Sequence, residues 1–501
     1  MRRSSSRVRA AASLLVLCVV STGCAAGQLA TAPDDPNTIS VGFAAEPQNF
    51  DFTRTDGAAI PQALLGNVYE GLVKLDRDGK IVSGLAESWT LSPDRTVYDF
   101  RLRPGVRFAN SAPFTAEDVK FSLERVHTAW TVSLKSTMDV LDHVEVVSPL
   151  HARVVLKRPS NGWLFAMTGR IGAMFTPSGV GELGTKPVGT GPYEVFSRVR
   201  GDSIVMRYRE GYWGPKPTYT TVRLKYYRDP TALNNALLSN GIDVVSTVTA
   251  PDSLPQFTTD PRFTVIEGTT NGEVVLSFNN RRAPLTDPRV RKALTHAIDR
   301  AALLRLAWGG RGTLIGSMVP PTDPWYEDLT ATTPHDPETA RRLLAEAGQR
   351  ELSLRLRIPN LAYAVNSAQV IKSDLAKVGV TVTIEPLDFP AIWLKQVFTE
   401  HDYDLSIVQH AEARDIATFG NPGYYWGYDN PKVRANLEHA DAGDPEEQVR
   451  LMRQVARELA GDAAAAWLFL FPNLLVARTK VTGLPRNVVS ESFDLAALGR
   501  S

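Results

Sequence analysis

Cysteine is nearly absent from this chain of 501 residues, since its two cysteines, Cys18 and Cys24, both lie within the first twenty-five positions. The rest of the chain therefore cannot form a disulfide, a cysteine-ligated zinc site or a cysteine nucleophile. An excess of one charge is also missing, because 55 basic side chains face 54 acidic ones. With no basic block to displace counterions, nucleic acid is not an expected partner.

Sequence patterns typical of hydrolases are missing as well. The eight histidines are scattered, and neither His-Glu-x-x-His nor Gly-x-Ser-x-Gly occurs. These absences give no support to a zinc hydrolase or to a serine hydrolase with a nucleophile elbow. We expect no catalytic residues and no cofactor.

Apolar runs long enough to cross a membrane are lacking. The first run, residues 10–20, follows four arginines and is shorter than the ~20 residues of a membrane-spanning helix. Small residues, Ser21 to Gly23, come next, and this order predicts a cleaved signal peptide over residues 1–23. The longest later run, 463–477, is interrupted by Pro472 and Asn473 and is predicted to be buried core.

Cys24 directly follows the small residues and resembles the modified cysteine of a bacterial lipobox, which carries a diacylglycerol thioether. Ser21 stands where such motifs usually have leucine, so a plain signal peptide with a chance cysteine is the alternative. Residues 24–36 are small, polar and proline-containing, as in a flexible tether. We expect an exported protein, lipid-anchored at the outer face of the cytoplasmic membrane, or secreted or periplasmic if Cys24 is not lipidated.

Short runs with apolar residues at every second position dominate the first half of the chain. They predict strands with one solvent-facing side at 38–44, 96–102, 143–156, 193–208 and 221–227. Between them, Thr115 is predicted to cap a helix whose apolar stripe includes Val119, Leu123 and Val126.

Beyond residue 285 the pattern changes to long helices that alternate with compact apolar runs. Asp-Pro pairs at 287–288, 336–337 and 444–445 each place a capping carboxylate before a proline at the first helical position. Strands are predicted at 352–358, 380–387 and 404–409. Strand, helix and strand at this spacing predict βαβ crossovers and a partly parallel sheet, so two lobes should meet near residues 275–285.

The predicted strand at 404–409 ends in a polar cluster that an aromatic cluster follows. Ligands of open α/β sheets bind beyond the carboxyl ends of strands, and polar groups beside aromatic walls suit a small-molecule cleft. The predicted ligand-binding residues in this segment are Gln409, His410, Glu412, Arg414, Asp415, Tyr424, Tyr425 and Trp426. The alternative is an internal ion-pair network beside core aromatics, with no ligand.

Several segments are similar to one known family. They are NVYEGLVKLDRDGKIVSGLAESW (67–89), AEDVKFSLERV (116–126), GTGPYEVFSR (189–198) and FNNRRAPLTDPRVRKALTHAIDR (278–300). Together with the anchor signal they resemble the substrate-binding lipoproteins of peptide/nickel-type ABC importers, solute-binding protein family 5. The resemblance extends from about residue 37 to residue 480.

The resemblance implies an α/β fold: a two-lobed, periplasmic-binding-protein-like clamshell of type II with an extra strand-rich subdomain in lobe one. Lobe one would comprise residues 37–275, with the subdomain inserted at about 67–184, and residues 470–501, which return to it. Lobe two would comprise residues 276–469. The implied protein is a monomeric receptor, not an enzyme, which binds an oligopeptide or peptide-like polar solute by hinge closure. Its partners would be this ligand, ABC permease subunits and, through the lipid anchor, the membrane.

The resemblance also suggests roles for single residues. Glu46 matches the stretch where peptide-binding members place an acidic residue at the cleft, although it could simply end a strand. Those members hold the peptide's amino terminus by the aspartate of a Trp-x-x-Asp segment, which here reads Gln409 to Glu412. Glu412 keeps a carboxylate for an ammonium group, but the tryptophan is gone. Arg414 could clamp a ligand carboxylate in a fork.

Three alternatives of function remain from the sequence. One is an exported hydrolase that uses Glu412 and Asp415 as paired carboxylates. Another is a receptor for chelated nickel with His410 as the single protein ligand, although such metals usually take several N or S ligands. The last is a surface lipoprotein that serves as a sensor or adhesin.

Overall fold

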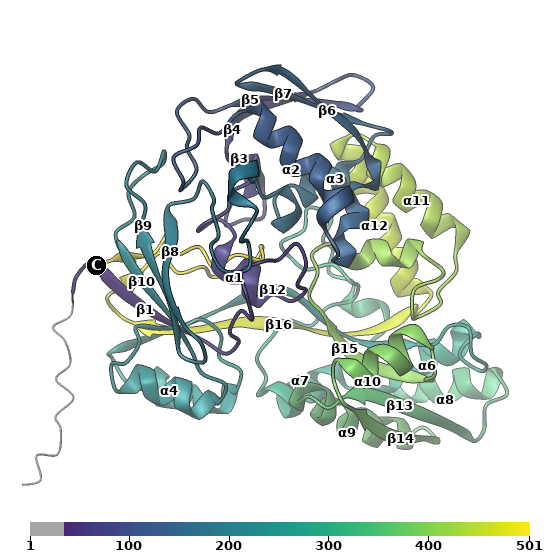
Figure 1. Cartoon of the computed structure of the whole chain (residues 1–501). Coiled ribbons are helices and arrows are strands. Elements are labelled where there is room, and N and C mark those ends of the chain that lie inside the picture. The colour runs from purple at the N-terminus through teal and green to yellow at the C-terminus, as the bar shows by residue number, and fades with distance from the viewer. Residues whose placement is uncertain (1–34) are drawn as a thin grey trace, which may run out of the picture. The chain divides into compact units, whose positions relative to one another are not determined.

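The computed structural model describes residues 35–501, so the predicted signal peptide and Cys24 lie outside the described residues. Residues 37–501 form one compact unit (Figure 1). Within the described part of the chain, no helix combines the length and the apolar character that crossing a membrane requires.

One mixed sheet of ten strands runs through this unit. In spatial order its strands are β14 (Val380–Leu387), β13 (Leu352–Pro359), β15 (Leu405–His410), β12 (Phe263–Phe278), β16 (Ala465–Arg478), β11 (Val244–Val245), β1 (Thr38–Phe43), β10 (Thr221–Tyr226), β9 (Ser203–Tyr208) and β8 (Tyr193–Val199). β13 pairs in parallel with β14 and with β15, as the spacing of strands and helices in this half predicts.

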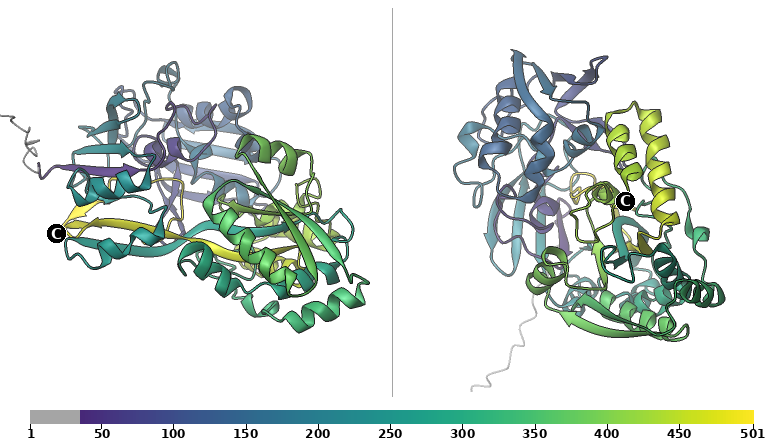
Figure 2. Two further views of the ribbon diagram at one scale, coloured as in Figure 1. Left: turned by 90° about the horizontal axis from the view of Figure 1, so that it is seen from below. Right: turned by 90° about the vertical axis from the view of Figure 1, so that its right-hand side faces the viewer.

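β12 and β16 are the longest strands and pair antiparallel from Phe263↔Arg478 to Ser277↔Ala465. They run lengthwise through the unit, past both predicted lobes (Figures 1 and 2). The register between them shifts between Thr269 and Glu273, which places an irregularity in the middle of both strands. A bulge locally disrupts the ladder and bends the strand, so this point is suited to be a hinge.

The predicted subdomain 67–184 carries its own antiparallel sheet. Its strands are β4 (Ala86–Leu91), β5 (Val97–Leu102), β7 (His151–Leu156) and β6 (Leu141–Ser148), with a separate hairpin of β2 (Val73–Leu75) and β3 (Ile81–Ser83). The runs 143–156 and 193–208, each predicted as one strand, are hairpins instead. In the second, Gly201 has a φ of 76°, which turns β8 back into β9.

The α-helices of the described chain are α1 (Ala59–Leu64), α2 (Ala116–Ala129), α3 (Asn161–Ala166), α4 (Pro230–Leu238), α5 (Pro255–Thr258), α6 (Pro288–Ala297), α7 (Arg300–Trp308), α8 (Pro337–Glu346), α9 (Ala362–Ala376), α10 (Ala391–Trp393), α11 (Pro431–Ala442) and α12 (Pro445–Gly461). Four of them, α2, α6, α8 and α12, begin directly after the capping residues that the sequence predicts. Asp287, Asp336 and Asp444 each accept a backbone N–H of the first turn. Thr115 forms a capping box with Asp118.

Helices cover both faces of the lobe-two sheet. One buried cluster joins α6, α7, α8 and α9 to the face that includes Val274, Leu276 and Ile407. Another joins α11 and α12 to the opposite face, which includes Val275 and Val408. Lobe one has its own buried cluster around Phe52, Tyr69 and Phe175. After β16 the chain returns to lobe one as β17 (Val481–Thr482) and β18 (Gly499–Arg500), and Leu495 N–H donates to Asn67 Oδ1 (3.0 Å).

Candidate functional site

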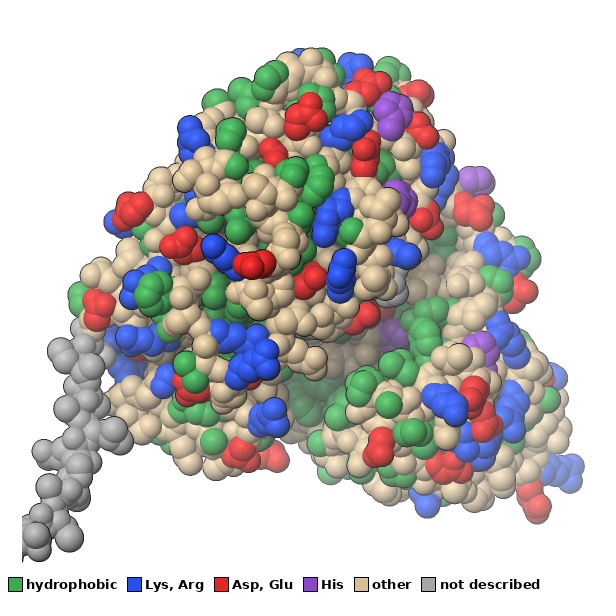
Figure 3. Space-filling view, viewed as in Figure 1, with side chains coloured by type: hydrophobic (Ala, Val, Ile, Leu, Met, Phe, Trp, Pro, Cys, Tyr) green, Lys and Arg blue, Asp and Glu red, His purple; other side chains and the backbone are tan. Residues whose placement is uncertain are grey.

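A recess lined with hydrophobic side chains opens between the two lobes in the space-filling view (Figure 3). A cavity of about 10 Å³ lies at the irregularity of β12, where Asn271 lines it. Lobe one contributes Leu75, Gly79, Phe165 and Val489 to the cavity wall, and the hinge strand and lobe two contribute Asn271, Thr322, Asp323 and Ala413. Because both lobes line it, this cavity changes whenever the lobes move apart.

A larger hollow of about 290 Å³ lies at the far end of β12 and β16, beside Phe263 and Arg478. Its lining residues all belong to predicted lobe one. A rotation of lobe two would leave it unchanged, so we take the interlobe cavity as the candidate site.

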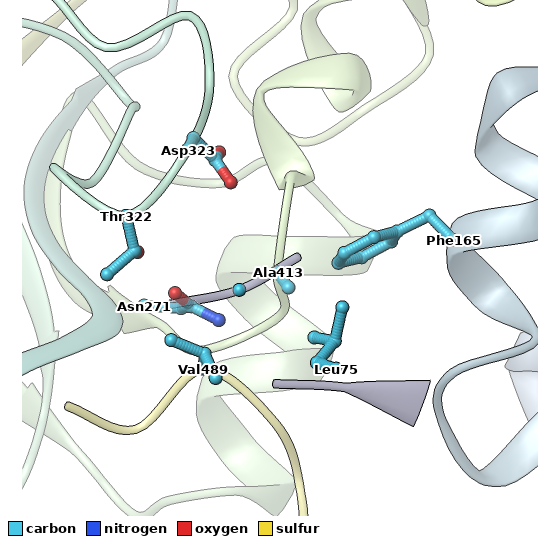
Figure 4. Close-up of a pocket in the computed structure, with 8 residues that line it drawn as sticks. Leu75, Phe165, Asn271, Thr322, Asp323, Ala413 and Val489 are labelled. Carbon is cyan, nitrogen blue, oxygen red and sulfur yellow. The ribbon is translucent and has the colours of Figure 1, made fainter. Parts of the chain in front are cut away.

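Asp323 belongs to the lobe-two wall of the cavity, and Arg414, which follows the cavity residue Ala413 in sequence, lies beside Asp323. The Asp323 carboxylate is directed into the cavity (Figure 4), and its Oδ1 lies 3.8 Å from Arg414 Nε. The Arg414 guanidinium carbon lies 3.6 Å from the ring centroid of Phe165 and 4.7 Å from that of Trp325. Burial lowers the pKa of Arg414 to about 10 and raises the pKa of Asp323 to about 6. Arg414 thus joins the lobes through Phe165, instead of extending freely towards a ligand carboxylate.

His410, Asp415 and Tyr425 form a buried network at the end of β15. Tyr425 Oη lies 3.0 Å from His410 Nε2 and 2.6 Å from Ser277 Oγ, and Asp415 Oδ2 lies 3.2 Å from His410 Nδ1. Neither carboxylate oxygen of Asp415 accepts a hydrogen bond of good geometry. Burial raises the pKa of Asp415, while His410 opposes the shift.

The other predicted residues of this segment separate into exposed and buried groups. Glu412 is exposed, and no basic side chain within residues 35–501 forms an ion pair with it. Tyr424 is half-buried, whereas Trp426 is buried and stacks on Phe419 with ring centroids 4.1 Å apart. Gln409 points to the opposite face of β15 from His410, and its N–H donates to Tyr363 Oη (3.0 Å).

Glu46 lies apart from this segment. Its carboxylate accepts hydrogen bonds from Arg198 Nη2 (2.8 Å) and from the N–H of Gly201 (2.9 Å), both at the β8–β9 hairpin. Arg198 and Gly201 hold the pKa of Glu46 below its usual range, although burial opposes them. The structure therefore places Glu46 in an ion pair within lobe one and does not bring it together with Glu412 or His410.

The structure adds residues that sequence reasoning missed. Glu273 stands opposite His410 in the β12–β15 pairing, is 1% exposed, and has an Oε2 atom without a hydrogen-bond partner. Burial and the neighbouring Asp415 raise its pKa well above the usual range. Only one signal in the sequence pointed to it: a carboxylate directly before the apolar run Val274 to Leu276. Asp323, Asn271 and Phe165 carried no such signal.

The lobes also touch outside the cavity. Asp441, at the end of α11, accepts hydrogen bonds from Arg158 Nη1 (2.8 Å), Ser160 Oγ (3.0 Å) and the N–H of Gly162 (2.8 Å). Asn161 Nδ2 donates to the carbonyls of Ala440 (2.9 Å) and Gly443 (2.8 Å). The amino end of α3 in lobe one is thereby docked on the α11–α12 turn of lobe two.

The alternatives of a metal receptor and a hydrolase depend on how the carboxylate and histidine side chains are grouped. Among residues 35–501, no group of three or more His, Cys, Asp or Glu side chains is arranged to hold a metal ion. The carboxylates proposed for hydrolysis differ in access, because the Asp415 side chain is 7% exposed while Glu412 is exposed.

Comparisons with known proteins agree with the two-lobed geometry. The di/tripeptide-binding protein 2 of Pseudomonas aeruginosa is 30% identical over 402 residues, which make up 73% of this chain and 75% of that protein. The glutathione-binding protein GsiB of Escherichia coli O1:K1 is 29% identical over 340 residues, which make up 66% of this chain and 65% of that protein.

Among solved structures, the binding protein DppA from Helicobacter pylori, in complex with the peptide STSA, superposes with a TM-score of 0.77. It is 22% identical in sequence, and the match covers 92% of this chain and 98% of that one. The predicted α/β, two-lobed fold is confirmed. The family profile of bacterial extracellular solute-binding proteins, family 5 (middle region), matches residues 80–434. This chain therefore belongs to the bacterial extracellular solute-binding proteins of family 5.

Proposed function

We propose that this protein is the extracytoplasmic substrate-binding component of an ABC importer, which captures an oligopeptide or a peptide-like polar solute and delivers it to a permease. The observation that carries the proposal is the interlobe cavity at the bulge of β12, lined from both lobes. A ligand that contacts both walls binds the closed form better than the open form and shifts the equilibrium towards closure. Catalysis is not required.

Glu412 is the proposed partner of the ligand's ammonium group, because it is an exposed carboxylate beside the cavity residue Ala413 and has no basic partner within the described chain. Tyr424, half-buried, supplies an aromatic wall. His410, Asp415, Tyr425 and Trp426 are buried and hold the end of β15 in place. Ligand contacts of Glu46 and Gln409 stay predictions. Glu46 is paired with Arg198, and Gln409 points to the face of β15 opposite to His410.

The test is native mass spectrometry of protein prepared without residues 1–24, to identify a co-purified ligand, followed by calorimetric titration of that ligand. Glu412→Ala should weaken binding about ten- to a hundredfold, the value of one or two charge-assisted hydrogen bonds. Glu438→Ala, an exposed carboxylate on α11, is the matched control and should leave affinity unchanged. Turnover of a chromogenic peptide or glycoside, abolished by Glu412→Gln, would contradict the receptor function.

Anchoring through Cys24 is the second part of the proposal. It rests on the sequence pattern alone, since Cys24 lies outside the described residues. Cys24→Ala should release the full-length protein from the membrane fraction to the soluble fraction, measured by fractionation and immunoblotting. Unchanged retention in the membrane fraction would count against lipidation.

A further inference from the structure

Three carboxyl groups lie close together at the interlobe cavity: Glu273 of β12 and Asp415 after β15, which are buried, and Asp323 of the loop after α7, which is half-buried and lines the cavity. We call them the buried acidic cluster. Glu273 stands opposite His410 in the β12–β15 pairing, and Asp415 Oδ2 lies 3.2 Å from His410 Nδ1. Asp323 Oδ1 lies 3.8 Å from Nε of Arg414, the residue directly before Asp415, so strand pairing and these contacts bring the three groups to one place. They come from separate segments, and none of the family-like segments contains them.

Most oxygen atoms of the cluster lack a well-formed hydrogen bond. Glu273 Oε2, Asp323 Oδ2 and both oxygens of Asp415 are shielded from solvent and accept no hydrogen bond of good geometry. Glu273 is 1% exposed and Asp415 is 8% exposed. Carboxyl groups in such surroundings are normally hydrogen-bonded or paired, because burying an unpaired carboxylate is costly.

The basic groups nearby do not balance the cluster. Arg414 is the nearest cation to Asp323, at 3.8 Å, but its guanidinium also stacks between Phe165 and Trp325. His410 is the nearest base to Asp415, at 3.2 Å, and its other ring nitrogen contacts Tyr425. Three carboxyl groups therefore share one guanidinium and one imidazole, and Glu273 has neither in hydrogen-bonding contact. Burial raises the pKa of all three carboxyl groups, as expected for incomplete compensation.

Asp323 is the member of the cluster that lines the cavity, and its carboxylate is directed into it (Figure 4). A cavity of about 10 Å³ admits a group no larger than a water molecule. A primary ammonium head has this size and donates three hydrogen bonds, whereas a guanidinium is larger and planar. With the lobes in the arrangement described, the cavity thus has room for an ammonium head and not for a guanidinium.

We propose that the buried acidic cluster receives an ammonium group of the ligand, in addition to any group held by Glu412, so that the preferred solute is a peptide or peptide-like compound with a lysine-like amine. This inference rests on the proposed function and specifies its substrate class. Glu273, Asp323 and Asp415 are then the residues that set specificity for the cationic side chain.

The experiment is calorimetric titration of tripeptides that carry lysine, norleucine, arginine or glutamate at each position, with alanine elsewhere. Norleucine has the same carbon chain as lysine without the ammonium. At one position, lysine should bind at least tenfold more tightly than norleucine and more tightly than arginine, and glutamate should bind worst. Glu273→Gln and Asp323→Asn, which preserve shape, should each reduce the lysine-to-norleucine ratio to below threefold.

Two control variants separate the cluster from its surroundings. Glu438→Gln on α11 should keep the wild-type ratio, and Glu412→Gln should keep the ratio even though overall affinity falls. If tripeptides bind but lysine and norleucine bind equally at every position, the inference is overturned while the proposed function stands. If no tripeptide binds and native mass spectrometry finds no co-purified solute, the proposed function itself fails. A co-purified solute without an amine overturns the inference alone. Should one variant not fold, the wild-type ratio and the other variant still decide the outcome.

Discussion

The half-buried carboxyl group of Asp323 should make the unfolding free energy depend on pH. Burial is the main cause that raises the pKa of Asp323 from 3.8 to about 6. The folded state then binds this proton more tightly than the unfolded state, so the stabilisation is complete below about pH 4 and is lost as the pH rises through about 6. Relative to Asp323→Asn, the wild type should lose on the order of 3 kcal/mol of unfolding free energy across this window. Urea unfolding at several pH values measures it, and parallel curves for the two proteins would contradict it.

Arg291 on α6 is a second residue on which the unfolding free energy should depend. It is 6% exposed and donates to the carbonyls of Ala463 (2.9 Å), Leu285 (2.8 Å) and Asp462 (2.9 Å), which fixes α6 to the turn before β16. Arg291→Ala leaves these carbonyls without their donors and should cost about 3 kcal/mol of unfolding free energy, measured by chemical denaturation. Arg289→Ala is the matched control, because its exposed side chain pairs with Asp287. A loss as large for Arg289 would show that helix propensity, and not the buried donor, is being measured.

At this scale the sequence pointed to a segment, and the structure shows which neighbours its residues contact. Polar residues after an apolar strand pointed to 409–426, and the structure does place Ala413 at the cavity. The sequence did not tell that Gln409 and His410 lie on opposite faces, because the predicted strand ended at residue 409, whereas β15 includes His410 and successive side chains of a strand alternate. Glu273 and Asp323 were missed because their proximity to Asp415 depends on tertiary pairing of distant segments.

Helix starts could be predicted from neighbouring residues, whereas the longest strand depends on distant ones and could not. The Asp-Pro helix starts and the Thr115 cap were predicted correctly, since capping depends on three or four neighbouring residues. β12 was not predicted, although it is the longest strand. Its apolar alternation is broken by the polar stretch Thr269 to Gly272, where the register shifts, and its existence depends on pairing with β16. Pairing of this kind leaves no signal in a short window of sequence.

Close packing of the C-terminal tail on β12 predicts the effect of a glycine substitution. A Cβ at Gly268 would lie 1.8 Å from the carbonyl oxygen of Arg486, a backbone atom. Gly268→Ala should therefore displace the tail and lower the unfolding free energy by about 2 kcal/mol, measured by thermal and chemical denaturation. Gly461→Ala at the end of α12 is the control, because nothing lies within 4 Å of its Cβ position and alanine favours the helix. Equal effects of both substitutions would contradict this explanation.

For the whole molecule, the docking of α3 on the α11–α12 turn should favour the closed form without touching a ligand. Asp441→Ala removes the acceptor of three hydrogen bonds that cross between the lobes. The open form should gain population, and ligand affinity should fall about tenfold because closure is part of binding. Small-angle scattering should show a larger radius of gyration for the ligand-free variant.

Asp429→Ala is the control for this prediction, because Asp429 precedes the same helix, is exposed and pairs with Arg434. It should match the wild type in both affinity and scattering. An unchanged radius and affinity in Asp441→Ala would mean that the α3 contact does not influence closure.

The position of β16 has a consequence for the order in which the molecule is made. In the ten-stranded sheet, β16 alone connects the four strands that end with β12 to the five that begin with β11. Yet β16 comprises residues 465–478, close to the end of the chain. While synthesis and export proceed from the amino terminus, the two halves of the sheet can form, but they cannot be joined until nearly every residue has emerged. The hinge is therefore the last part of the receptor to be built, and a polypeptide that stops before residue 465 has two half-sheets with nothing to hold them in register.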